Sequence, residues 1–211
     1  MSALNEKLFV NPPNERNTVT VGRDCPVCTL EPFDSGVGEY TKEDMNAVFQ
    51  MLIGEATSPN VAKQKKLDAT NEDHAKEAFA ISSAIFNRAK YDKELMEKKK
   101  RPAPVVWGFM SNGTPLGVAM SGKVIAYTAG HHKTHFAQAK KLGEIGKGKP
   151  YCEWLIILKE QAEKAANNPR GRDAYSEWRT HDDKRSVGRT RILNTDLWEK
   201  KIDYPELMDS P

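Results

Sequence analysis

The stretch that decides the fold is residues 41–56, which read TKEDMNAVFQMLIGEA. Thr41 can cap the free N–H groups at the start of a helix, and the two acidic residues that follow suit the positive helix end. Apolar side chains then recur at the spacing of one helical face, at Met45, Val48, Phe49 and Leu52. Gly54 and the TSPN sequence after it favour termination. The stretch therefore predicts a buried helix that begins at Thr41.

Three more helices are predicted from the same periodicity. One starts near residue 70 and stops before Pro102, and its inner face consists of Ala75, Ala78, Phe79, Ser82, Ile85, Phe86 and Ala89. Another covers residues 131–142, and the last begins at Tyr151. The lysine-rich residues 61–70 predict an exposed loop between the first two helices.

The other segments have little periodicity. Residues 1–40, with a Cys-Pro-Val-Cys motif, predict an irregular N-terminal arm, and residues 41–211 are expected to form the helical domain. Residues 105–130 hold an Asn-Gly turn signal and predict a short β-hairpin or an ordered loop lining a cleft. A C-terminal segment is expected to pack back onto the core through Leu193, Leu197, Trp198 and Ile202. The expected fold is mainly α.

Composition excludes some classes. The chain of 211 residues is 38% hydrophobic and 29% charged, as in ordinary globular proteins. No run approaches the roughly 18 apolar residues of a membrane span, and residues 1–17 lack the pattern of a Sec signal peptide. The net charge of +3 is mild: it would suit weak attraction to an anionic polymer such as peptidoglycan or nucleic acid, but it identifies neither, and a nucleic-acid partner is not the favoured expectation.

Glu55 is the candidate catalytic residue. It lies three residues after Leu52 and seven after Val48, so it projects from the buried side of the helix at its end. A carboxyl group held against apolar neighbours resists ionisation, because burial penalises the charged form. Such a group can protonate a glycosidic oxygen as a general acid. On this local pattern alone, Glu55 could also be a solvent-exposed acid at a helix end.

Two short blocks carry a family resemblance. The first is IGEA at residues 53–56, and the second is AFAISSAIFNR at residues 78–88, which ends in an apolar-Asn-Arg signature. Together they resemble the cell-wall hydrolase family that includes the spore cortex-lytic enzymes. The resemblance covers roughly residues 45–170, and it implies a lysozyme-like or lytic transglycosylase-like fold with Glu55 as the catalytic acid. The lysine-rich insertion at about 61–72 departs from the family pattern.

The resemblance implies glycan-strand cleavage in peptidoglycan without a cofactor or metal. After Glu55 protonates the leaving oxygen, a second carboxylate could activate water, or the 6-hydroxyl of the sugar could attack and leave an anhydro product. The insertion offers three acids for the second role, although acids at a helix start are more commonly caps: Asp68, Glu72 and Asp73. The candidate sugar-binding residues are Trp107, Phe109, Asn112 and Tyr127, and core packing is the alternative for Trp107 and Phe109.

The resemblance also suggests a setting. The implied partners are peptidoglycan glycan strands and, for an antibacterial toxin, a cognate inhibitor (immunity) protein. A phage lysis protein and a toxin delivered by a contact-dependent secretion machine both act in the periplasm or on the cell wall without a Sec signal. Asn87 and Arg88 are expected to have a structural role near Glu55.

Cysteines and histidines offer a second function class. Three cysteines exclude a fully paired disulfide framework, and Cys25 and Cys28 could form a small disulfide, supply half of a metal site or remain thiols. The spacing of His131, His132 and His135 could bind a metal in a nuclease, or it could be a surface cluster. A non-catalytic binding module is the third class, in which no single acid would matter.

Overall fold

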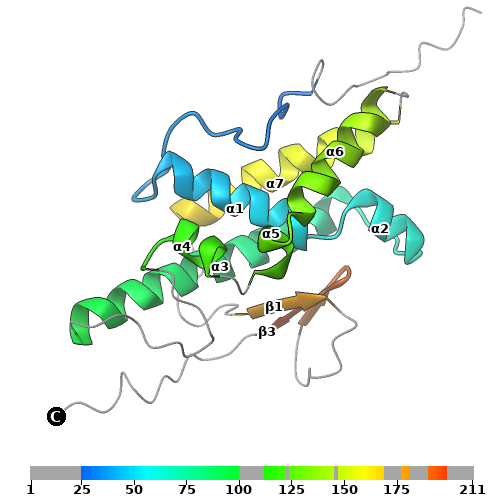
Figure 1. Cartoon of the computed structure of the whole chain (residues 1–211). Helices are drawn as coiled ribbons and strands as arrows, with labels where there is room; N and C mark the ends of the chain where they lie inside the picture. Colours follow the sequence, from blue (N-terminus) through cyan, green and yellow to red (C-terminus); the bar gives the residue numbers. More distant parts are fainter. Residues whose placement is uncertain are drawn as a thin grey trace, which may run out of the picture.

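The computed structural model describes residues 25–99, 112–121, 124–144, 147–168, 177–180 and 190–198. Within these ranges the protein is mainly helical, as the sequence predicts, and a small antiparallel sheet lies beside the helices (Figure 1). The helices are α1 (Lys42–Glu55), α2 (Pro59–Gln64), α3 (Asn71–Lys99), α4 (Pro115–Met120), α5 (Ile125–Thr128), α6 (His131–Glu144) and α7 (Lys149–Asn167). The strands are β1 (Glu177–Thr180), β2 (Thr190–Ile192) and β3 (Thr195–Trp198). None of the helices described is both long and apolar enough for a membrane span.

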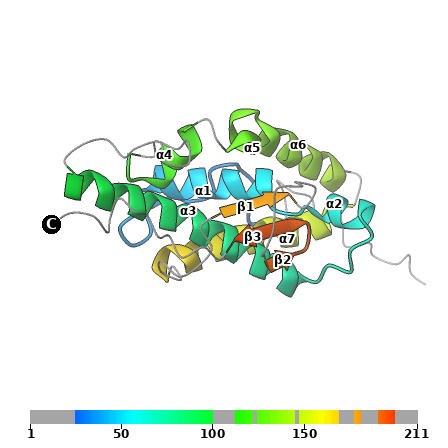
Figure 2. The same cartoon turned by 90° about the horizontal axis from the view of Figure 1, so that it is seen from below.

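Helix α1 begins as predicted and is enclosed by other helices. Thr41 and Asp44 form a capping box, in which each side chain accepts a hydrogen bond from the other residue's backbone N–H at 3.1 Å. All side chains from Asp44 to Ile53 are buried except that of Gln50, because α3, α4, α6 and α7 pack against the helix. Figure 2 shows α1 between the row of α4, α5 and α6 and the long helix α3. Glu55 therefore lies at the end of a helix that other helices enclose.

Helix α3 runs antiparallel to α1. Near its start, Glu77 bonds Thr57, which follows the end of α1. Near its end, Lys93 forms an ion pair with Glu39, which precedes α1, at 3.4 Å. The segment 80–89 is buried on all sides, which is more than the predicted single inner face. Glu77 and Lys93 of α3 thus lie beside opposite ends of α1.

The Asn87-Arg88 signature lies inside α3, which continues to Lys99, so it does not mark the end of a helix in this protein. Both side chains are buried. The guanidinium of Arg88 stacks over the ring of Trp178 at 4.6 Å and so connects α3 to strand β1. Arg88 therefore has a packing role between α3 and the sheet, eleven residues along α3 from Glu77, whereas the expected role at a helix end near Glu55 is not seen.

The sheet has the strand order β1-β3-β2 and packs on α3. Leu193 and Asn194 form the turn between β2 and β3, and Leu193 has a positive φ of 51°. Leu197 of β3 is fully buried in the core, which confirms that this segment packs back onto the helices. Ile202 and the side chain of Trp198 lie outside the described residues.

Two predicted segments differ in the structure. Residues 59–64 form helix α2 instead of part of a loop, because Ser58 caps it and Pro59 suits its first position. In the region where a hairpin was one expectation, Asn112 and Gly113 do form a turn with positive φ, but Thr114 caps helix α4 directly after it. The described part of residues 105–130 therefore consists of the short helices α4 and α5 with turns beside them, and residues 105–111, with Trp107 and Phe109, lie outside the described residues.

The N-terminal segment is connected covalently to the last helix. Residues 25–40 have an irregular backbone with a single bridge between Val37 and Tyr40. Cys25 forms a disulfide with Cys152 of α7, whereas Cys28 is an exposed free thiol. Pairing of Cys25 with Cys28, one of the three alternatives, is therefore wrong.

Candidate functional site

Glu55 is the last residue of α1 and is partly exposed. The residues around it in the chain are apolar and buried: Leu52, Ile53 and Ala56. Ala56 leaves the helix with an extended backbone (φ −74°, ψ 151°). Glu55 is thus a partly exposed residue at the point where the buried helix α1 ends.

Helix α6 fixes the backbone on the N-terminal side of Glu55. The Nδ1 atom of His135 donates a hydrogen bond to the Ile53 carbonyl oxygen at 2.9 Å. This carbonyl belongs to the last turn of α1, where carbonyl groups lack helical partners. The histidine cluster therefore contributes a backbone contact two residues before Glu55.

Helix α3 fixes the backbone on the other side, through Glu77. One carboxylate oxygen of Glu77 accepts from the Thr57 N–H at 2.8 Å, and the other accepts from the Thr57 hydroxyl at 2.6 Å. The hydroxyl of Thr195, on β3, is a third donor to the same carboxylate. Glu77 is completely buried. A single carboxyl group therefore joins α3, the segment after α1 and the sheet.

Thr57 is held at each of its polar groups. Its hydroxyl oxygen accepts from the Asn194 N–H in the β2–β3 turn at 3.2 Å. The buried His74 hydrogen-bonds the Thr57 backbone. Burial raises the pKa of Glu77 to about 7, although the hydrogen bonds from Thr195 and Thr57 lower it in part. Thr57, two residues after Glu55, is thus bonded to α3 and to the β2–β3 turn.

Sequence reasoning missed Glu77. The prediction followed one apolar face of the helix, from Ala75 to Ala89. A second stripe, Glu77, Ile81, Ala84 and Arg88, keeps the same helical spacing and is also buried. The small residues between 80 and 84 signal a helix enclosed on all sides, and an acid at the end of such a stripe signals a buried polar network.

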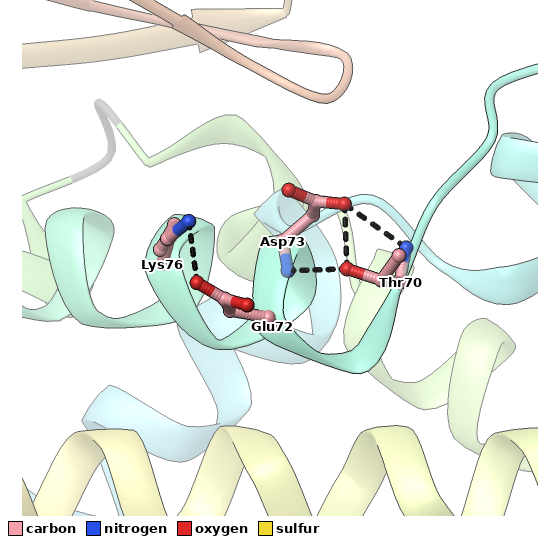
Figure 3. Close-up of polar contacts among 4 residues, drawn as sticks. All are labelled: Thr70, Glu72, Asp73 and Lys76. Carbon is pink, nitrogen blue, oxygen red and sulfur yellow. Dashed lines mark hydrogen bonds and ion pairs between the residues drawn. The ribbon is translucent and has the colours of Figure 1, made fainter.

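Two acids considered for the second catalytic role have other partners. Asp73 forms a capping box with Thr70: its Oδ2 accepts from the Thr70 N–H (3.1 Å) and hydroxyl (2.7 Å), and its N–H donates to Thr70 Oγ1 (3.2 Å) (Figure 3). These hydrogen bonds lower the pKa of Asp73. Glu72 pairs with Lys76 at 2.7 Å on the exposed face of α3. Asp68 is exposed before the helix.

The candidate sugar-binding residues lie in different places. Asn112 is exposed in a turn. The next residue, Gly113, packs closely against Lys93: a Cβ added to Gly113 would lie only 2.9 Å from the Lys93 Cβ. Lys93 is sixteen residues from Glu77 along α3, a helical distance of roughly 24 Å. The structure therefore places Asn112 at the opposite end of α1 from Glu55.

Tyr127 lies on the same side as the histidine cluster. Its ring is half-buried and stacks on His132 with ring centroids 4.9 Å apart. His132 is buried, whereas His131 is exposed. One face of the Tyr127 ring is thus already covered. Among the residues that the structure describes, no three His, Cys, Asp or Glu side chains gather in a way that could hold a metal ion.

Comparisons of the chain with protein-family models, with curated proteins and with solved structures found no match.

Proposed function

We propose that this chain cleaves the glycan strands of peptidoglycan and that Glu55 is its general acid. The observation that carries the proposal is the position of Glu55, a partly exposed carboxyl at the end of a buried helix. Its backbone is held on one side by His135 and on the other by the Glu77–Thr57 contacts. A general acid needs this kind of fixed direction, because it must reach one glycosidic oxygen at hydrogen-bond distance.

The proposed chemistry begins with proton transfer from Glu55 to the oxygen that leaves the sugar ring. Positive charge then develops at C1. The roles already taken by Asp73 as a cap and by Glu72 as an ion-pair partner favour the route that needs one carboxylate. In that route the 6-hydroxyl of the sugar attacks C1 and gives its proton to the Glu55 carboxylate, which leaves an anhydro end on the product and restores the acid.

The disulfide supports an extracytoplasmic place of action. Disulfides such as Cys25–Cys152 form and persist in oxidising compartments, including the bacterial periplasm, and are rare in the cytosol. We therefore place the proposed activity in the periplasm or on the cell wall, as a phage lysis protein or a secreted antibacterial toxin. For a toxin, the producing cell would need an inhibitor protein that covers Glu55.

Digestion of purified peptidoglycan tests the proposal. The wild type, Glu55→Gln and Glu43→Gln are compared, and the soluble products are identified by mass. Glu43 is the matched control, because it is an exposed acid on the same helix. We expect glycan fragments with anhydro ends from the wild type and the control, and none from Glu55→Gln.

Other products would change the assignment. Fragments with reducing ends would show that the bond is hydrolysed with the help of a second carboxylate, and the anhydro route would be wrong. Equal release by wild type and Glu55→Gln would remove Glu55 from the reaction. Binding to peptidoglycan without any release would favour the non-catalytic binding module.

A further inference from the structure

The polar network behind Glu55 is centred on one carboxyl group. Glu77 accepts hydrogen bonds from the Thr57 N–H, the Thr57 hydroxyl and the Thr195 hydroxyl. The Asn194 N–H adds a second contact between the hairpin turn and Thr57. The network thus joins a helix, a loop and a hairpin at a point two residues from the proposed acid.

We infer that Glu77 is a positioning residue for the proposed reaction: through Thr57, it fixes the backbone from which Glu55 presents its carboxyl. The inference rests on the proposed function. Glu77 itself is completely buried and its carboxylate oxygens are occupied by protein donors, so it acts through Thr57 and does not touch the substrate.

The chemistry of the site explains why a carboxyl group stands there. Three donors converge on the side chain, and a carboxylate has two oxygens with about four acceptor positions. A glutamine would offer one oxygen and would turn an N–H₂ group toward donors. An apolar residue would leave all three donors buried without an acceptor, and each such group costs about 1–3 kcal/mol. Burial raises the pKa of Glu77, so the site holds this group in spite of the cost to its charged form.

The connection to Glu55 is short and stiff. Ala56 is the only residue between Glu55 and Thr57, and it is itself buried. A movement of Thr57 is therefore transmitted to Glu55, while His135 holds the preceding turn through Ile53. Since a misplacement of 1 Å in a catalytic group can reduce a rate about 100-fold, small changes at Thr57 are expected to affect turnover.

Substitutions at both partners test the inference. Glu77→Leu removes all the acceptors. Because this variant could fail to fold, Thr57→Val removes only the hydroxyl at nearly constant volume, and Thr57→Ser restores it. Ser82→Ala is the matched control, since Ser82 is fully buried on the same helix and, among the described residues, its hydroxyl bonds its own helix, at the Ala78 carbonyl (2.7 Å). Activity on peptidoglycan, thermal unfolding and amide exchange at Thr57 are measured, with activity assayed well below the unfolding temperature.

We expect Thr57→Val to reduce kcat about 10- to 100-fold with little change in KM, and to accelerate exchange of the Thr57 amide. Thr57→Ser should recover most of kcat, and Ser82→Ala should keep wild-type kcat. If Thr57→Val loses stability but keeps kcat, Glu77 has a structural role only and the inference is wrong. If Glu55→Gln is as active as the wild type, the proposed function is wrong and the inference is wrong with it. If Glu55→Gln is inactive but Thr57→Val keeps wild-type kcat, the inference alone is wrong.

Discussion

Replacing both Cys25 and Cys152 by alanine is expected to lower the free energy of unfolding by several kcal/mol. The two cysteines are separated by 127 residues, and closing a loop of this length restricts the unfolded chain by an entropy worth about 5 kcal/mol at 25 °C. Measured losses for native disulfides fall at roughly 2–5 kcal/mol. Both residues are also buried, so their removal opens space in the core as well.

Urea unfolding of the wild type and the double variant, followed by circular dichroism, measures this difference. Cys28→Ser is the matched control, because Cys28 is an exposed free thiol, and its effect should stay within about 0.5 kcal/mol. Treatment of the wild type with a reductant should reproduce most of the loss. A difference below about 1 kcal/mol between wild type and double variant would refute the reasoning. A Cys25–Cys28 bond found by peptide mapping would refute it directly.

Three further predictions concern the packing and the polar network. The pKa of Glu77 is raised from 4.5 to about 7 in the folded protein, so Glu77 adds roughly 3 kcal/mol to the free energy of unfolding below pH 4.5, and this stability is lost as the pH rises through 7. Urea unfolding at several pH values between 4 and 8 should show this decrease, and Glu77→Gln should remove it. Thr70→Ala should lower the free energy of unfolding by about 1 kcal/mol, because it removes the cap of α3. Glu72→Gln should lower it by less than about 0.5 kcal/mol, because the ion pair of Glu72 is exposed. Equal losses for the two variants in urea unfolding would contradict this prediction. Trp154→Ala should cost about 3–5 kcal/mol in thermal unfolding, since its side chain is 1% exposed, and a loss under about 1 kcal/mol would be inconsistent with the core.

Local signals predicted the four longer helices, α1, α3, α6 and α7, but not the short helices α2, α4 and α5. The Thr41 cap, the apolar spacing after it and the small residues of the second helix are all properties of neighbouring positions in the chain. The structure confirms the starts of α1 at Lys42 and α3 at Asn71. The position of Glu55 at the end of α1 followed from the same periodicity.

Contacts between distant segments could not be predicted in this way. Nothing in the spacing of Cys25 and Cys28 indicates a bond to Cys152, because disulfide connectivity depends on the fold. The contact between Glu77 and Thr57 depends on the antiparallel packing of α3 and α1, and the hairpin residue Asn194 lies 137 positions from Thr57. Following a single apolar face of the helix over residues 71–99 also missed Glu77, because it lies on a second face that is buried as well.

The measurement that tests the central claim most directly is a parallel assay of binding and cleavage with insoluble peptidoglycan. Wild type and Glu55→Gln are incubated with the polymer, the bound protein is determined by sedimentation, and the released glycan is determined by mass. The account predicts that Glu55→Gln sediments with the polymer as the wild type does but releases no glycan, because the substitution removes the acidic proton and keeps the shape of the side chain. Release of glycan by Glu55→Gln at the wild-type rate would contradict the account.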